Sequence, residues 1–544
     1  MTPSHLQSPL VSLMVGIATC LIASSGCSKP TDSIDPMRVF QDQQIRVGIP
    51  ANSAIKTAFE EIQSEWEFQT GAKVELIEHL PEQIQSSPTQ TFAGDDILIF
   101  PSWALGDLAE NDRLHRLEHT LLEDENLDWN DFFPVLKNYF SRWSRATLSI
   151  PLGTPTLVCY FRRDLLEQYG HSPPHDWESY FRVAQSITRT SAASDNSQSK
   201  PQLGLAEPLG KEWRRFVFLA RAATYSKHPN NYSFLFDLRS MKPLIAEDGF
   251  ILALEDMVTA RDLSPLTSSD QERIDTWIKN ENRNSYGDDA NRIYEGGSPL
   301  FDEKSGDTRN RYDYILEKHP ELQANLNYNV SDVQHALRTG QAMLGLGWEY
   351  PNRRQSTGTD HIAAIGITSL PGSNRVFDTT RKQWENMDEN PNQPAFLGFM
   401  SLSLSLSKST DNLDVATHFT RYFFEYLSNN WPPEQGDPSV VPFRNTHQGN
   451  IMAWVHDDLG NQEAQQFFTI QQSATSSDNF VFDLRIPGSQ QYMTALDQAL
   501  HETLNGLSKP RKALETVAEK WESITNTYDR TKQRENYRKS LPIP

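Results

Sequence analysis

Strands and helices alternate at the start of the folded part of the chain, and this order restricts the fold more than any other feature. The β-branched run 45–50 precedes a helical apolar pattern over 55–66, and strand-like runs follow at 73–77 and 96–100. This order is typical of a mostly parallel sheet with crossover helices. Such sheets hold ligand groups in the loops that follow the strands. The sequence therefore predicts an α/β fold with binding residues in those loops.

The composition excludes several classes of protein. The chain has 544 residues, 37% of them hydrophobic and 22% charged, which argues against wholesale disorder. At about 100–200 residues per domain, this length predicts two to four domains or lobes. The 50 Lys and Arg against 71 Asp and Glu give a formal net charge of −21. Because such a surface repels phosphate backbones, we expect no nucleic-acid partner.

The cysteines do not form a structural framework. Cys20, Cys27 and Cys159 make no CxxC pair, and no Cys/His zinc spacing is present. We therefore expect neither a metal site nor a cofactor. Cys159 lies in the apolar run LVCYF, which predicts a buried, unreactive thiol.

The amino terminus has the pattern of an export signal. An uncharged apolar stretch covers residues 9–23, which is short for a membrane span of about 20 residues but suits a secretory signal. The following Ser-Ser-Gly-Cys27 resembles a bacterial lipobox. We predict a lipoprotein-type signal peptide at 1–26, lipidation of Cys27 and a tether at 27–39, which places the protein on the periplasmic side of the cell envelope. An uncleaved anchor helix is the alternative, because the first 28 residues contain no Lys or Arg.

Several longer segments resemble, in their order, the extracellular solute-binding proteins of bacterial ABC importers. They are most similar to the sugar-binding, maltodextrin-binding-like family 1 type. The segments are FPSWALGDLAENDRLHRLE, LSIPLGTPTLVCYFRRDLLEQYGHSPPHDWESYFRVAQSIT, DVQHALRTGQAMLGLGWEYPN and FLGFMSLSLSLSKSTDNLDVATHFTRYFFEYL. The chain departs from the family pattern in a polar insertion at about 264–330, a polar stretch at 373–394 that we expect to be a loop, and Phe161-Arg162 where an aromatic–Asn pair is usual.

The resemblance implies a two-lobe periplasmic-binding-protein-like fold of type II, with mostly parallel sheets, flanking helices and a hinge. Lobe 1 would comprise 40–148 plus 371–435. Lobe 2 would comprise 152–366 plus 440–535, including the insertion. Hinges are expected near 149–153, 368–372 and 432–440, where prolines and glycines allow rigid lobes to close around a ligand.

A sugar ligand needs aromatic rings for its C–H faces and planar polar groups for its hydroxyls. The candidate rings and polar groups are Trp103, Tyr160, Trp348, Tyr492, Asn52, Glu349, Arg353 and Arg444. Core packing is the alternative for the rings, and a surface ion pair is the alternative for Glu349 and the two arginines. If Trp103 and Trp348 bind the ligand, each change to alanine should weaken binding by about 1–3 kcal/mol with little loss of folding.

These features predict a monomeric binding lipoprotein that captures a sugar or oligosaccharide and delivers it to an ABC permease. A non-sugar solute such as an anion, polyamine or metal, or service to a sensor, is the alternative. A carbohydrate-active enzyme is disfavoured. The acidic pairs at 95–96, 288–289 and 457–458 consist of adjacent residues, whose side chains point apart, and no GxSxG, HExxH or GxxxxGK[ST] motif is present.

Overall fold

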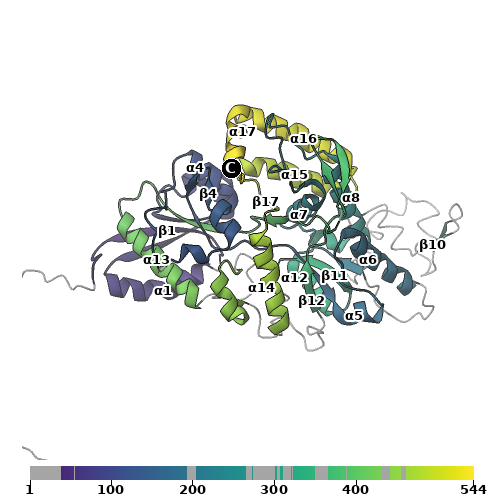
Figure 1. Cartoon of the computed structure of the whole chain (residues 1–544), viewed down its shortest axis with the longest axis horizontal. Helices are drawn as coiled ribbons and strands as arrows, with labels where there is room; N and C mark the ends of the chain where they lie inside the picture. The colour runs from purple at the N-terminus through teal and green to yellow at the C-terminus, as the bar shows by residue number, and fades with distance from the viewer. Residues whose placement is uncertain are drawn as a thin grey trace, which may run out of the picture.

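Two open sheets, each covered by helices, form the two halves of the protein (Figure 1). A computed structural model describes residues 38–53, 55–125, 127–192, 204–264, 272–273, 300–302, 307–309, 320, 323–348, 365–387, 389–430, 441–454 and 461–543. The predicted signal peptide with Cys27, most of the insertion at 264–330, the hinge at 432–440, and the candidates Glu349 and Arg353 lie outside the described residues.

The first sheet has the strand order β2-β1-β3-β16-β6. The parallel strands β1 (Gln44–Pro50), β2 (Lys73–His79) and β3 (Ile97–Pro101) lie where the sequence predicted strands. β16 (Leu402–Leu406) runs antiparallel to β3 and to β6 (Ile150–Pro151). The helices α1 (Ile55–Thr70) and α13 (Leu413–Asn430) pack together through Phe59 and Phe423, whose stacked rings are 4.3 Å apart.

The second sheet has the order β12-β7-β11-β8. Here β7 (Val158–Arg162) runs antiparallel to both β11 (Ala342–Gly347) and β12 (Ile365–Ser369), while β8 (Gly204–Ala206) is parallel to β11. The helices of this half are α5 (Arg163–Gln168), α6 (Trp177–Ala192), α7 (Arg214–Ser226), α8 (Asp248–Asp262) and α12 (Val330–Arg338). The α/β two-lobe architecture predicted from the sequence is confirmed.

The chain crosses between the halves more than once. It leaves the first sheet after β6 and enters β7 through residues 152–157. It returns after β12 through β13 (Arg375–Asp378), β14 (Gln383–Asn386) and β15 (Ala395–Leu397) before entering β16. The prediction of a loop at 373–394 is therefore wrong. β13 and β14 form an antiparallel hairpin that packs on α7 and α8. Val376 and Phe377 are buried in it, and this short apolar pair is hidden in the sequence by its polar surroundings.

The helix that precedes β11 ends close to a glycine. α12 ends at Arg338, and Gly340 takes a φ of +72°, a left-handed conformation that glycine adopts without strain. The apolar residues that follow form the fully buried strand β11. A Cβ at Gly345 in this strand would lie only 2.8 Å from the Val333 side chain. The glycine thus allows α12 to pack closely on the sheet.

The carboxyl-terminal third adds helices to both halves. α15 (Ser489–Leu504) and α16 (Pro510–Thr527) pack on α7 and α8, whereas α14 (Asn461–Ser476) lies between the halves beside β12 and β15 (Figure 1). β17 (Phe480–Phe482) pairs with β15. The last helix, α17 (Arg530–Lys539), reaches the first half through an ion pair of 2.8 Å between Lys539 and Glu110. The lobe limits inferred from the sequence stay a prediction, and a backbone hydrogen bond from Phe133 to Phe443 ties residue 443 to the first half.

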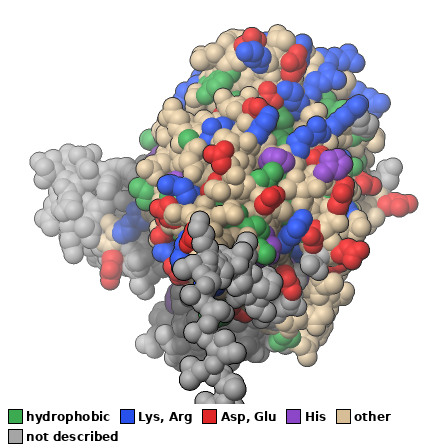
Figure 2. All heavy atoms as spheres, turned by 90° about the vertical axis from the view of Figure 1, so that its left-hand side faces the viewer, with side chains coloured by type: hydrophobic (Ala, Val, Ile, Leu, Met, Phe, Trp, Pro, Cys, Tyr) green, Lys and Arg blue, Asp and Glu red, His purple; other side chains and the backbone are tan. Residues whose placement is uncertain are grey.

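Short elements complete the described chain. These are α2 (Pro81–Ser86), α3 (Pro88–Thr91), η1 (Ser102–Ala104), α4 (Leu105–Glu110), η2 (Trp129–Asp131), η3 (Leu136–Phe140), β4 (Arg142–Trp143), β5 (Ala146–Thr147), β9 (Leu300–Asp302), β10 (Asp307–Arg309), η6 (Ala324–Asn327) and η9 (Asn445–Trp454). No helix in the described ranges has both the length and the apolar character needed to cross a bilayer. On the face shown in Figure 2, acidic and basic side chains are interspersed.

Candidate functional site

The carboxyl-terminal edges of the two sheets face each other. In the first half, β3 ends at Pro101 and Trp103 follows it in η1. The residues just before β16 lie at the same edge, because Ser102 donates its backbone N–H to the Ser401 carbonyl at 3.0 Å. In the second half, Glu207 follows β8 and Trp348 follows β11, and these parallel strands end at one edge. Loops of both sheets therefore meet where such folds hold ligands.

A cluster of four aromatic rings joins these edges. The ring of Phe399, from the loop before β16, stacks on Trp348 with centroids 4.1 Å apart and an interplanar angle of 30°. It also meets Phe216 edge-on at 4.2 Å and Trp213 at 5.3 Å. Phe399 and Trp348 are each only 1% exposed. Since Phe399 belongs to the first half and the other three rings to the second, the cluster holds the halves together.

A second contact between the halves involves α4 and the segment that leads into α15. A Cβ at Gly106 would lie 2.0 Å from the backbone oxygen of Arg485, so only glycine fits there. The Gly488 N–H donates to Asp107 Oδ1 at 3.3 Å, and the Ser489 hydroxyl donates to the Trp103 carbonyl at 3.5 Å. The backbones of the two halves are thus in direct contact beside Trp103.

Buried polar atoms without hydrogen-bond partners lie beside the rings. In the described part of the chain, Trp348 Nε1, Asp483 Oδ2 and Arg215 Nε have no such partner. Asp483 is placed next to the Phe399 loop because its N–H donates to the Leu397 carbonyl at 2.8 Å. Burial raises the pKa of the Asp483 carboxyl, and Arg215 partly opposes this. An unsatisfied buried polar group costs about 1–3 kcal/mol, which solute hydroxyls can offset by hydrogen bonding.

Asp107 is a titratable residue of α4, at the contact with the segment that leads into α15. Burial raises its pKa to about 6, although the Gly488 N–H favours the charged form. The folded state therefore binds an extra proton between about pH 4 and pH 6. The stability that this proton provides is complete below the unfolded pKa of about 3.9 and is lost as the pH rises through the folded value.

Replacing Asp107 with asparagine should stabilise the protein at pH 7.5 by about 1–3 kcal/mol, because the amide keeps the acceptor for Gly488 without a buried charge. The difference should vanish near pH 4. Urea denaturation at both pH values measures it. Asp411→Asn, at an exposed carboxylate, should change stability little at either pH. Equal stability of Asp107→Asn and the parent at pH 7.5 would contradict a buried charge.

The structure places three of the sequence-predicted residues at the facing edges, and one of them, Trp348, is buried in the ring cluster. Trp103 is partly buried and packs on the same apolar cluster as Trp348. Asn52 is exposed in the loop after β1, with a φ of +61° that asparagine tolerates. The ligand roles of these residues stay predictions.

Three other candidates have the contacts of core residues. The sequence left this alternative open for the two tyrosines, whereas for Arg444 the alternative was a surface ion pair, and Arg444 is only 2% exposed. Tyr160 is fully buried in β7, and its ring lies against Gly347. Tyr492 is fully buried, its hydroxyl lies 3.0 Å from Thr525 Oγ1, and burial raises its pKa to about 12. Arg444 lies on the first half with its guanidinium 4.3 Å above the Phe132 ring, and burial lowers its pKa to about 10.

We call the four-ring cluster and the buried polar groups beside it the aromatic junction. Several of its residues were missed in the sequence analysis. These are Trp213, Arg215, Phe216, Phe399 and Asp483. The first three follow β8, which has only three residues and shows no recognisable period in the sequence. Phe399 precedes an alternating run, and this position alone does not indicate that its ring reaches the other half.

A buried ion pair lies at the carboxyl end of β8 in the second half. Glu207 and Arg221 are both 0% exposed and lie 2.6 Å apart. Tyr180 donates its hydroxyl to Glu207 at 3.1 Å, and Arg221 lies 4.3 Å above the Trp177 ring. The pair connects the end of β8 to α7 and α6 and so orients the start of α7. Within the described ranges, no three His, Cys, Asp or Glu side chains are grouped to hold a metal ion.

Solved structures share this architecture, although none of the protein-family models matches the sequence. The GacH receptor of Streptomyces glaucescens, solved unliganded and with acarbose, is 14% identical with a TM-score of 0.54, over 89% of this chain and 99% of that one. The sugar-binding protein MalE of Xanthomonas citri is 15% identical with a TM-score of 0.57, over 89% and 98%. An ABC transporter solute-binding protein of Agrobacterium radiobacter in complex with ribitol is 13% identical with a TM-score of 0.57, over 90% and 100%. The chain therefore has the two-lobe, type II fold of the solute-binding proteins of ABC transporters.

Proposed function

We propose that this chain is the binding component of an ABC importer and captures a neutral polyhydroxy solute, a sugar or a polyol, between its halves. The observation that carries the proposal is the aromatic junction at the facing sheet edges, where Trp348 stacks on Phe399. Trp103 follows β3 at the edge that also holds the residues before β16. The solute is released unchanged to a permease, and the chain acts as a carrier and not as an enzyme.

The chemistry of the junction suits such a solute. Rings cover the C–H face of a sugar, while the buried indole N–H of Trp348 and the carboxylate of Asp483 are a donor and an acceptor for hydroxyl groups. A solute that touches both halves shifts their equilibrium by its differential affinity for the closed form. The solved structures described above carry acarbose and ribitol, and both ligands are rich in hydroxyls.

Export and anchoring are part of the same proposal. Cleavage after residue 26 and lipidation of Cys27 would hold a monomer at the membrane through its tether, on the periplasmic side, where it can meet the permease. An anion, a polyamine or a metal remains the alternative cargo, and a sensor the alternative partner.

A thermal-shift panel tests the class of solute, because a ligand that binds only the folded form raises Tm. We expect at least one of maltose, maltotriose, ribitol and mannitol to raise Tm, and phosphate, spermidine and Zn²⁺ to leave it unchanged. If phosphate, spermidine or Zn²⁺ raises Tm and none of the sugars and polyols does, the sugar assignment is wrong.

For a solute that raises Tm in this panel, Trp103→Ala should weaken binding by about 1–3 kcal/mol. Calorimetry measures this loss of affinity. Trp129→Ala is the matched control, since this ring is also partly buried on the first half but packs against Phe132. It should leave the affinity unchanged. Equal affinities of Trp103→Ala and the parent would remove Trp103 from the site.

A further inference from the structure

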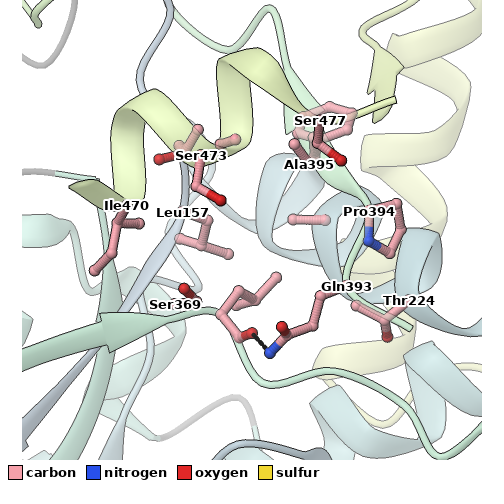
Figure 3. A pocket seen from close by; sticks show the side chains of 14 residues that line it. Leu157, Thr224, Ser369, Gln393, Pro394, Ala395, Ile470, Ser473 and Ser477 are labelled. Carbon is pink, nitrogen blue, oxygen red and sulfur yellow. Dashed lines mark hydrogen bonds between the residues drawn. The ribbon is translucent and has the colours of Figure 1, made fainter. Parts of the chain in front are cut away.

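A cavity of about 120 Å³ lies where the chain crosses between the halves (Figure 3). Its walls come from three separate passages of the chain, at 156–157, 369–370 and 393–396, and from the helices α7 and α14. It is separate from the ring cluster, and Phe396 in its wall lies 6.5 Å from Phe216, which belongs to that cluster.

The described residues of the lining are amphiphilic and uncharged. The floor is apolar and buried, with Leu157, Ala220 and Phe396. The rim is exposed and polar, with the hydroxyls of Ser369 and Ser473 and the amide of Gln393 (Figure 3). Among the described residues, no Asp, Glu, Lys or Arg lines the cavity.

The amide of Gln393 is held in place at the rim. Its Nε2 donates to the Leu370 carbonyl at 3.0 Å and to the His175 carbonyl at 3.2 Å. Since both amide hydrogens are used, the amide presents its oxygen as an acceptor. An occupant with a hydroxyl group can donate to this oxygen while its carbon chain covers the floor.

Size and polarity together define the occupant. An engineered cavity of about 150 Å³ in another protein binds benzene, so a cavity of this size admits a molecule of about four to six heavy atoms. An ionised group would lose hydration without gaining a counter-charge. We propose that the cavity is a second binding site, distinct from the aromatic junction, for a neutral alcohol or diol of three to four carbon atoms.

Occupancy of this site should act on the hinge. The walls belong to segments that connect the two halves, so a change in the angle between the halves moves them relative to one another. A molecule that fits the spacing seen here favours this arrangement by its differential affinity. The inference does not depend on which solute binds at the aromatic junction.

Saturation-transfer NMR with 1,2-butanediol tests the site, with butyrate and butylamine as charged comparison probes. The parent protein should bind the diol and neither charged probe. Ala474→Leu, which fills the cavity from α14, and Ser473→Leu, which changes only the exposed rim, should each weaken diol binding at least tenfold. Gln466→Leu adds the same apolar side chain to an exposed position of α14 outside the cavity and should bind as the parent does.

Two results would overturn the site. One is the absence of diol binding by the parent, and the other is equal binding by all three variants. X-ray scattering tests the link to the hinge, because saturating diol should make the parent more compact and leave Ala474→Leu unchanged. An unchanged scattering curve of the diol-saturated parent would reject that link.

Discussion

Replacing Phe399 with alanine should separate the two halves and lower the free energy of unfolding by about 3–5 kcal/mol, the usual cost of removing a buried phenylalanine. The ring is 1% exposed and provides the stacked contact with Trp348 at 4.1 Å. Its neighbours Gly398 and Met400 have φ values of +107° and +43°, and a non-glycine residue in this region is strained. Loss of the ring therefore removes the contact and also the packing that holds this strained loop.

Denaturant unfolding measures the loss of stability, and the radius of gyration from X-ray scattering measures the separation. Phe377→Ala is the matched control. Phe377 is 4% exposed and packs edge-on against Trp384, within the same hairpin. We expect it to lose comparable stability without expanding. If both variants expand equally, or neither does, Phe399 does not hold the halves together.

Replacing Gly106 with alanine should have the second-largest effect. The new Cβ would lie 2.0 Å from the Arg485 carbonyl oxygen and 2.9 Å from the Trp143 ring. Because the closest atom belongs to the backbone of the other segment, a side-chain rotation cannot relieve the overlap. We expect a cost of about 3 kcal/mol, at the upper end of the usual range for overpacking, together with a larger radius of gyration.

Gly94→Ala controls for the added methyl group, since a Cβ at Gly94 has no atom within 4 Å. It should leave both stability and dimensions unchanged. A Gly106→Ala protein with the dimensions and the unfolding midpoint of its parent would show that α4 and the segment before α15 are not in contact in solution.

Three strands of the first sheet, β1, β2 and β3, could be predicted because their apolar runs are long enough to show a pattern. The run LSLSLS at 402–407 alternates apolar and small polar residues and contains β16, yet its serines are not solvated. Ser403 and Ser405 are 2% and 0% exposed. Ser405 donates its hydroxyl to the Leu148 carbonyl at 2.5 Å. Small hydroxyl side chains bonded to the backbone can be buried as readily as apolar ones, so alternation alone does not identify a solvated face.

The candidate site could be predicted only in part. Position after a predicted strand made Trp103 a candidate, and the structure places it after β3. Trp348 follows the strand β11, which the sequence did not predict. The partner of Trp348 could not be predicted, because Phe399 reaches it only after the chain has folded back into the first sheet. Tyr492 has the same residue type as a ligand-stacking ring, but its environment is set by the packing of α15 on α16, which local sequence does not reveal.

The ion pair between Lys539 and Glu110 joins residues 429 positions apart. Translation proceeds at about 5–20 residues per second, so the lysine emerges about 20 to 90 seconds after its glutamate partner. During this interval the amino-terminal half has to remain folded, or be kept from aggregating, without the ion pair to Lys539. A codon change or a translational pause within the last helix would prolong that exposed interval and should lower the yield of native protein without altering a single side chain.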